Sequence, residues 1–344
     1  MNRGLLLSAA GVGAYLAYRA LRPSYAFRDR HVVITGGSRG LGLVLARQFA
    51  AAGARLSICS RDSHELARAM AELQERGARV AAIECDVADR NRVREFLAVA
   101  RRQNGPIDVL VNNAGIIQVG PMEAMREEDY DESLRIHFWA SLYTSLEVLP
   151  EMKARGCGRI VNIASIGGKI AVPHLLPYTV GKFALVGFSN GLREEVARHG
   201  IAVTTVCPGL MRTGSHLNAR FKGRHQDEFA WFALGGSLPG LSMSAESAAR
   251  RILEACSRGD AEVVLGLPFK LAVDAWTLFP NLMASIAGLA DRFVLPKSGG
   301  IGSKSEPGSR SHGRLPRAFT RLSDRAAADN NELHACAVGD HHER

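Results

Sequence analysis

Residues 32–42 read Val-Val-Ile-Thr-Gly-Gly-Ser-Arg-Gly-Leu-Gly, and a helical pattern follows them in Leu43-Val44-Leu45-Ala46-Arg47-Gln48-Phe49. The β-branched run at 32–34 predicts a buried strand, so the glycines stand between a strand and a helix. Glycine lets the backbone turn tightly and approach an anion, while the first helical turn offers free N–H donors. The Gly-x-x-x-Gly-x-Gly spacing in this context predicts a turn that binds a dinucleotide.

The chain alternates apolar runs with amphipathic stretches up to about residue 265, which is the βαβ pattern of a parallel sheet. Strands are expected near 31–35, 55–59, 79–84, 108–112, 158–164, 202–207 and 262–265. Helices are expected near 40–52, 63–76, 90–103, 128–155, 178–199 and 244–257. This pattern predicts an α/β fold: a Rossmann-like, doubly wound parallel sheet of about seven strands in a single domain.

Unusual residues follow several of these strands directly. Thr35, Asn112, Ser165 and Pro208 all stand at predicted strand ends. The carboxyl ends of parallel strands meet at one edge of a sheet, and ligands bind in the crevice there. We therefore expect these residues to lie around one site.

Tyr178 and Lys182 are four residues apart, which places both side chains on one face of a helix. A free phenol has a pKa of about 10 and holds its proton too tightly for acid–base work near neutrality. A neighbouring ammonium group favours the phenolate and lowers that pKa. The pair predicts a proton donor and its activator, although helix surfaces often carry such pairs without function.

Taken together, these motifs resemble those of the short-chain dehydrogenase/reductase family. The resemblance rests on Thr35-Gly36-x-x-x-Gly40-x-Gly42, Asn112-Asn113-Ala114-Gly115, Ser165, Tyr178-x-x-x-Lys182 and Pro208-Gly209, and it spans about residues 30–265. It implies an oxidoreductase that transfers a hydride between a nicotinamide cofactor and a carbonyl or secondary alcohol. In this family Tyr178 would exchange the proton, Lys182 would lower its pKa and bind the nicotinamide ribose, and Ser165 would hydrogen-bond the substrate oxygen.

One position departs from the family pattern. Where the family has the helical asparagine of its proton relay, this chain has His137. The family residue is thought to act largely through its backbone carbonyl, which histidine retains. Because imidazole titrates near neutrality, His137 is a candidate fourth catalytic residue. The favoured interpretation is a tolerated substitution on a buried helix.

The end of the second strand bears on the choice of cofactor. It reads Cys59-Ser60-Arg61, without the acidic residue that binds ribose hydroxyls in NAD enzymes. Arg39 adds a second positive charge, and arginine pairs well with phosphate. We predict NADP(H) rather than NAD(H), with solvated arginines as the alternative. The predicted cofactor-binding set is Gly36, Ser38, Arg39, Gly40, Leu41, Gly42, Arg61, Asp86, Val87, Asn113, Ala114, Gly115, Tyr178, Lys182, Pro208, Gly209 and Thr213.

The substrate is expected to be a lipophilic small molecule, such as a steroid, retinoid or acyl-chain carbonyl. An aromatic cluster at 229–232 follows Thr213, and the stretch from 166 to 176 is largely apolar, although core packing explains both equally well. Two other functions stay open. One is a non-catalytic NADP-binding sensor or scaffold on the same fold. The other is epimerase or dehydratase chemistry of the extended branch, whose Gly-x-x-Gly-x-x-Gly motif is not seen here.

Composition narrows the range of partners. The chain has 344 residues, 47% of them hydrophobic, and a formal net charge of +9. It shows no basic stripe interleaved with aromatic residues, so we expect no nucleic-acid partner; an anionic dinucleotide or lipid fits the charge better. The six cysteines (59, 85, 157, 207, 256 and 336) lack metal-ligand spacing. We expect buried thiols, no metal, and a reducing compartment.

The two ends differ from the predicted catalytic domain at 28–268. Residues 1–27 form a hydrophobic N-terminal segment, 269–296 an apolar helical segment interrupted near Pro280, and 297–344 a tail whose composition predicts disorder. For residues 4–21 three interpretations stay open: a membrane anchor, a helix packed on the domain, and a cleaved signal. An anchor would leave the catalytic domain facing the cytoplasm; otherwise we expect a cytoplasmic protein. The family resemblance implies a homodimer or homotetramer built through the helices at 128–155 and 178–199.

Overall fold

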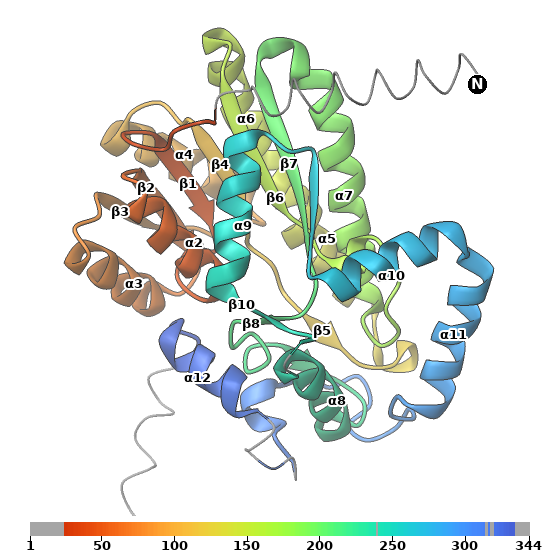
Figure 1. Ribbon diagram of the computed structural model, residues 1–344. Coiled ribbons are helices and arrows are strands. Elements are labelled where there is room, and N and C mark those ends of the chain that lie inside the picture. Colours follow the sequence, from red (N-terminus) through yellow and green to blue (C-terminus); the bar gives the residue numbers. More distant parts are fainter. Residues whose placement is uncertain (1–23, 239, 314–315, 317–319, 334–344) are drawn as a thin grey trace, which may run out of the picture.

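The core of the computed structural model is a seven-stranded parallel sheet in the order β11-β7-β6-β4-β1-β2-β3 (Figure 1). The structure describes residues 24–238, 240–313, 316 and 320–333. The strands are β1 (His31–Thr35), β2 (Arg55–Ser60), β3 (Val80–Glu84), β4 (Val109–Asn112), β6 (Gly158–Ile163), β7 (Ile201–Pro208) and β11 (Glu262–Leu265). They lie within a residue or two of the expected positions, and the predicted Rossmann-like fold is confirmed.

Helices cover both faces of this sheet (Figure 1). One face carries α2 (Gly40–Ala51), α3 (Ser63–Glu75) and α9 (Ala245–Arg258), and the other carries α4 (Arg90–Asn104), α5 (Glu127–Leu134), α6 (Ala140–Arg155) and α7 (Leu176–Val196). Because side chains alternate along a strand, Val32 and Ile34 of β1 pack into the first core and Val33 into the second. A π-helical turn, Arg135–Trp139, joins α5 to α6 within the expected long helix.

Beyond the carboxyl edge of the sheet lies a smaller layer. It contains the three-stranded sheet β12-β9-β5 and the pair β10-β8. Its elements are β5 (Gln118–Val119), β8 (Met211–Arg212), β9 (Arg220–Phe221), α8 (His225–Ser237), β10 (Met243–Ser244) and β12 (Glu306–Pro307). Phe229 of α8 is fully buried against Val119 and Phe221. Core packing therefore accounts for Phe229 within the aromatic cluster at 229–232, which was one reason to expect a lipophilic substrate.

The direction of winding changes between β1 and β4, which are neighbours in the sheet. Side chains bind the two strand ends together there. Thr35 Oγ1 accepts hydrogen bonds from the N–H groups of Asn113 (3.0 Å) and Ala114 (3.1 Å). In return, Asn113 Nδ2 donates to the carbonyls of Thr35 (3.1 Å) and Gly36 (2.9 Å). This reciprocal set, the Thr35–Asn113 clasp, fixes the crevice where a ligand is expected.

The apolar segment after the sheet forms two helices, α10 (Leu267–Leu278) and α11 (Pro280–Phe293), with the break at the expected proline. Figure 1 shows them projecting from one side of the domain. Neither contains a buried residue, and Leu278 and Phe293 are 70% and 71% exposed. Within the described ranges, we find no helix with the length and apolar character to cross a membrane. The candidate anchor at 4–21 lies outside the described residues and stays a prediction.

The prediction of a disordered tail over 297–344 is wrong for the part of it that the structure describes. Strand β12 pairs with β9, and helix α12 (Arg321–Asp329) packs against α8 and β8. Polar groups make many of these contacts: Ser323 Oγ lies 2.8 Å from Ser237 Oγ, and His216 pairs with Asp324 at 3.1 Å. This part of the chain therefore packs on the domain although it contains few apolar residues. Residues 334–344 lie outside the described part.

The packed domain also begins earlier in the sequence than the predicted boundary at residue 28. Tyr25 and Phe27 had been assigned to the segment before the domain, yet Phe27 packs edge-on against Phe49 of α2 with ring centroids 5.0 Å apart. The Tyr25 N–H donates to the Ser257 carbonyl (3.0 Å). The packed domain thus includes residues from 24 onward.

Substitution of Thr35 by valine tests the clasp. Valine keeps the shape but leaves the Asn113 and Ala114 N–H groups without their acceptor, so we expect a loss of about 1–3 kcal/mol in unfolding free energy. Thr35→Ser, which keeps the hydroxyl, is the matched control and should lose less. Urea unfolding measures both; equal stability of Thr35→Val and the wild type would contradict the structural role.

Candidate active site

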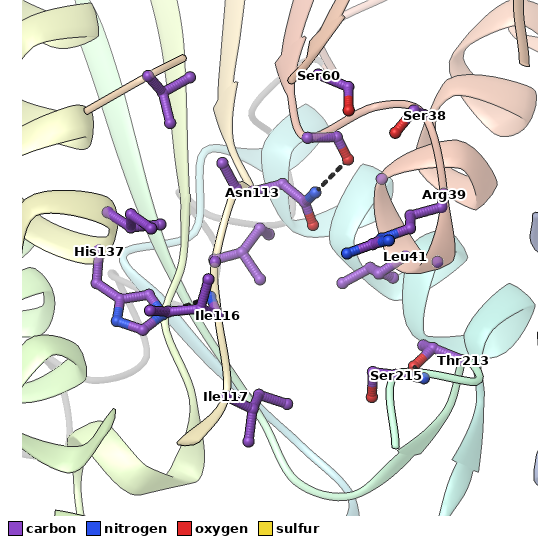
Figure 2. Close-up of a pocket in the computed structure, with 18 of the residues that line it drawn as sticks. Ser38, Arg39, Leu41, Ser60, Asn113, Ile116, Ile117, His137, Thr213 and Ser215 are labelled. Carbon is purple, nitrogen blue, oxygen red and sulfur yellow. Dashed lines mark hydrogen bonds between the residues drawn. The ribbon is translucent and has the colours of Figure 1, made fainter. Parts of the chain in front are cut away.

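One cavity of about 420 Å³ opens at the carboxyl edge of the sheet. Every residue predicted for the site from the sequence, catalytic or cofactor-binding, lines it. Figure 2 shows Arg39 and Leu41 of the glycine loop across the cavity from His137 and Ile116. The strand ends therefore bring together side chains from all parts of the domain, as the parallel sheet requires.

The glycine loop comes close to its own helix. A Cβ atom at Gly42 would stand 2.0 Å from the Gly36 carbonyl oxygen, so only glycine permits this turn. Gly40 has a φ of +55° and is the first residue of α2. The loop thus presents the amino end of a helix to the cavity, which favours anionic groups.

The two arginines predicted to bind phosphate have different surroundings. The guanidinium group of Arg39 pairs with Glu65 (2.7 Å) and Glu332 (3.5 Å). Arg61 is exposed at the cavity rim, and within the described part of the chain it has no ion-pair partner. Asp62 caps α3 by accepting a hydrogen bond from the Glu65 N–H (2.9 Å). Arg61 is thus the more accessible cation beside β2.

Ser165, Tyr178 and Lys182 lie together where β6 and α7 meet. Ser165 begins a short 3₁₀ turn (Ile166–Gly168) and accepts a hydrogen bond from the Gly167 N–H (3.0 Å). Tyr178 stands in the first turn of α7. Lys182 is buried, and its Nζ donates to the Ile163 carbonyl (2.8 Å) and lies 5.6 Å from the centre of the Tyr178 ring. The three side chains share one wall of the cavity.

The expected lowering of the Tyr178 pKa by Lys182 is not found. The surrounding protein removes water from the phenol and raises the pKa of Tyr178 to about 12, while a hydrogen bond with Ser165 acts in the opposite direction. Burial likewise lowers the pKa of Lys182 to about 7. Desolvation penalises both charged forms, and the Lys182 ammonium donates its hydrogen bond to the Ile163 carbonyl and not to the phenol. Tyr178 therefore keeps its proton at neutral pH.

His137 lies in the π-helical turn, with its ring edge-on to Tyr178 at a centroid distance of 5.3 Å. The Ile116 N–H donates to His137 Nε2 (3.3 Å). Ser133 Oγ gives its hydrogen to the Pro177 carbonyl (2.6 Å), so it accepts from His137 Nδ1 (3.1 Å). These partners assign one neutral tautomer, with the proton on Nδ1. Burial, reinforced by Lys182, holds the pKa of His137 well below its usual range.

Gly181, inside the Tyr-x-x-x-Lys motif, permits this arrangement. A Cβ atom there would stand 2.6 Å from Ser133 Oγ and 2.7 Å from His137 Nδ1. Nothing in the sequence pointed to Gly181 or Ser133, because their roles depend on the contact between α5 and α7. Other lining residues absent from the prediction include Ile116, Ile117, Ile136, Met211, Ser215 and Glu332. Only the proximity of 116 and 117 to the Asn-Asn-Ala-Gly motif offered a signal in the sequence.

The five cysteines within the described ranges are free thiols, and four of them are buried. Cys336 lies outside those ranges. In the same part of the chain, no group of three or more His, Cys, Asp or Glu side chains is arranged to hold a metal ion.

Known proteins resemble this chain over the region just described. Residues 30–222 match the profile of the family described as short chain dehydrogenase. Oxidoreductase UcpA of Salmonella typhimurium is 40% identical over 182 residues, which is 53% of this chain and 69% of that protein.

Solved structures are similar as well. A gluconate 5-dehydrogenase from Burkholderia cenocepacia, in complex with NADP and tartrate, aligns with a TM-score of 0.63 and 27% identity, covering 72% of this chain and 98% of that one. A variant of actinorhodin polyketide ketoreductase with NADPH aligns with a TM-score of 0.62 and 30% identity, covering 69% and 95%.

Substitution of His137 by asparagine separates the two hypotheses for this residue. Both ring nitrogens are engaged in hydrogen bonds and the charged form is disfavoured. We therefore expect His137 to hold Ile116 in place and not to relay a proton during the reaction. His137→Asn should lower kcat/KM severalfold and leave the pH profile unmoved. His64→Asn, on the exposed surface of α3, is the matched control. Loss of an ionisation from the profile in His137→Asn alone would identify a proton relay.

Proposed function

The chain belongs to the short-chain dehydrogenase/reductase family, and we propose that it reduces the carbonyl group of a lipophilic substrate with NADPH. The observation that carries the proposal is the convergence of Ser165, Tyr178 and Lys182 on the cavity that also contains the glycine loop. That arrangement puts a proton donor beside the region where a nicotinamide cofactor would lie.

The cofactor would supply the hydride to the carbonyl carbon. The residues of the chain handle the oxygen. Tyr178 gives its phenolic proton to the oxygen as negative charge develops there, and Ser165 hydrogen-bonds the same oxygen. Burial raises the pKa of Tyr178 to about 12, which makes it a weaker acid than a free phenol, but an alkoxide is more basic than a phenolate and can still take the proton. Lys182, 5.6 Å from the ring centre, stabilises the phenolate that remains.

Apolar side chains support a lipophilic substrate. Ile116, Ile117, Ile136 and Met211 line the cavity near the catalytic side chains. Desolvation by such a wall strengthens the hydrogen bonds to the reacting oxygen. The exposed apolar surface of α10 and α11 supports contact with lipid or with another apolar surface, through which such a substrate would arrive.

NADP(H) is proposed over NAD(H) because β2 ends at Ser60 and is followed by Arg61, with the carboxylate of Asp62 engaged in capping α3. An acidic residue free to bind the ribose hydroxyls is therefore missing at that point. The two solved structures compared above contain NADP and NADPH. Self-association as a homodimer or homotetramer and membrane contact through residues 4–21 stay predictions.

A panel of long-chain, polycyclic and sugar carbonyls, assayed for NADPH oxidation with and without lipid vesicles, tests this function. We expect turnover with apolar carbonyls and loss of more than about a thousandfold in Tyr178→Phe, because the proton donor is gone while the ring still packs. Tyr130→Phe, outside the cavity, is the matched control. Turnover of sugars alone would refute the lipophilic class. NADPH binding with no turnover of any carbonyl would favour a sensor or scaffold.

Replacement of Arg61 by alanine tests the choice of cofactor. Loss of one charge-assisted contact to a 2′-phosphate should lower the NADPH/NADH ratio of kcat/KM by about ten- to a hundredfold. Arg76→Ala, near the far end of α3, removes the same charge away from the cavity. A wild-type ratio below one, or an unchanged ratio in Arg61→Ala, would count against the proposal.

A further inference from the structure

The end of the described chain reaches into the cavity. We propose that residues 329–332, here called the docked segment, occupy the phosphate-binding part of the dinucleotide site and must leave before the cofactor binds. This inference rests on the proposed function. The docked segment lies outside residues 30–222, which match the family, and it would compete with the cofactor for the site.

Glu332 takes the place of an anion at the glycine loop. Its side chain is buried and lines the cavity, and its Oε1 stands 2.5 Å from the position of a Cβ atom on Gly40. Its Oε2 accepts a hydrogen bond from Asn218 Nδ2 (2.5 Å) and pairs with Arg39 Nε (3.5 Å). The space that a glycine leaves open for close approach of a phosphate is therefore filled by a carboxylate.

Backbone groups of the same loop are also engaged. The Gly40 N–H, at the amino end of α2, donates to the Asn330 carbonyl (2.9 Å). Asn331 Nδ2 donates to the carbonyls of Ser38 (2.8 Å) and Glu65 (3.0 Å). The donor that faces outward from the first turn of the helix is thus already used. A pyrophosphate placed there would lose that donor and meet a second anion.

Arginines outside the loop anchor the segment from the other side. Arg47 donates to the Asn330 side chain (2.9 Å) and to the Asp329 carbonyl (2.7 Å), and Arg68 donates to Asn331 Oδ1 (2.7 Å). These contacts join residues 329–331 to α2 and α3. Figure 1 shows α12, which leads into the segment, beside these two helices. The segment is therefore docked by several specific bonds.

The docked state also carries a desolvation cost. Burial raises the pKa of Glu332 to about 7 against the opposing effect of Arg39, so its carboxylate is held there at a cost. Release of Glu332 would also return Arg39 and the Gly40 N–H to the cavity. The same groups would then be available to a phosphate, which makes docking of the segment and binding of the cofactor mutually exclusive.

Titration of the full-length protein with NADPH, followed by calorimetry, tests the competition. If the segment is docked in about nine of ten molecules, the apparent Kd is about tenfold above its intrinsic value. Glu332→Ala and Asn331→Ala should each lower Kd toward that limit. Asp227→Asn removes a charge from an exposed side chain in the first turn of α8, away from the cavity, and should leave Kd unchanged. An unchanged or raised Kd in Glu332→Ala would overturn the inference, since the segment would then be neutral or part of the cofactor site.

Hydrogen exchange of the wild type gives an independent measurement. The amides of Asn330 and Glu332 donate to Ala326 (3.0 Å) and Ala327 (2.9 Å) in the docked state. They should exchange faster when NADPH saturates the protein; slower exchange would mean closure over the cofactor and would overturn the inference. Equal binding of NADPH by all forms overturns the inference alone. No binding by any form overturns the proposed function as well.

Discussion

The Thr35–Asn113 clasp is the constraint on which the site depends. It ties together the ends of β1 and β4, the two neighbouring strands between which the sheet changes its direction of winding. Each partner satisfies backbone groups of the other, so the glycine loop and the loop after β4 hold a fixed separation. The cavity is the space between those loops. Ser165 and Lys182 reach it only because β6 lies directly beside β4 in the same sheet.

The cavity wall formed by Ser165, Tyr178 and Lys182, with His137 beside it, carries little charge. Burial raises the pKa of Tyr178 to about 12, lowers that of Lys182 to about 7, and keeps His137 neutral. Hydrogen bonds, more than ion pairs, therefore hold these side chains in place. A wall of this kind offers little stabilisation to a resting phenolate and more to charge that develops during reaction, since charges interact strongly where water is excluded.

The sequence was sufficient for the sheet and for bringing the proposed catalytic side chains to one cavity. Each central strand is a short apolar run bounded by glycine or polar residues, and Ser165 stands at a strand end, where parallel topology gathers site residues. Tyr178 and Lys182 were predicted from their i, i+4 spacing on a helix, here α7. The sequence was insufficient where tertiary contact decides. The His137 tautomer depends on Ser133 and Ile116, and the fit of Gly181 depends on the approach of α5 to α7. The tail was misjudged because Asn330, Asn331 and Glu332 dock through polar bonds, whereas composition reports mainly on apolar burial.

Glu332 belongs to the same chain as the glycine loop that it contacts, so its competition with the cofactor would be intramolecular. A tethered group has an effective concentration fixed by the geometry of its tether, commonly in the millimolar range for short flexible links. Dilution of the protein does not weaken it, and a higher protein level does not strengthen it. Whether the docked segment or the cofactor occupies the cavity would therefore depend on the free cofactor concentration and not on the protein concentration. The threshold concentration for displacement would be a property of the chain itself. A substitution in the docked segment would reset that threshold without changing residues 28–268.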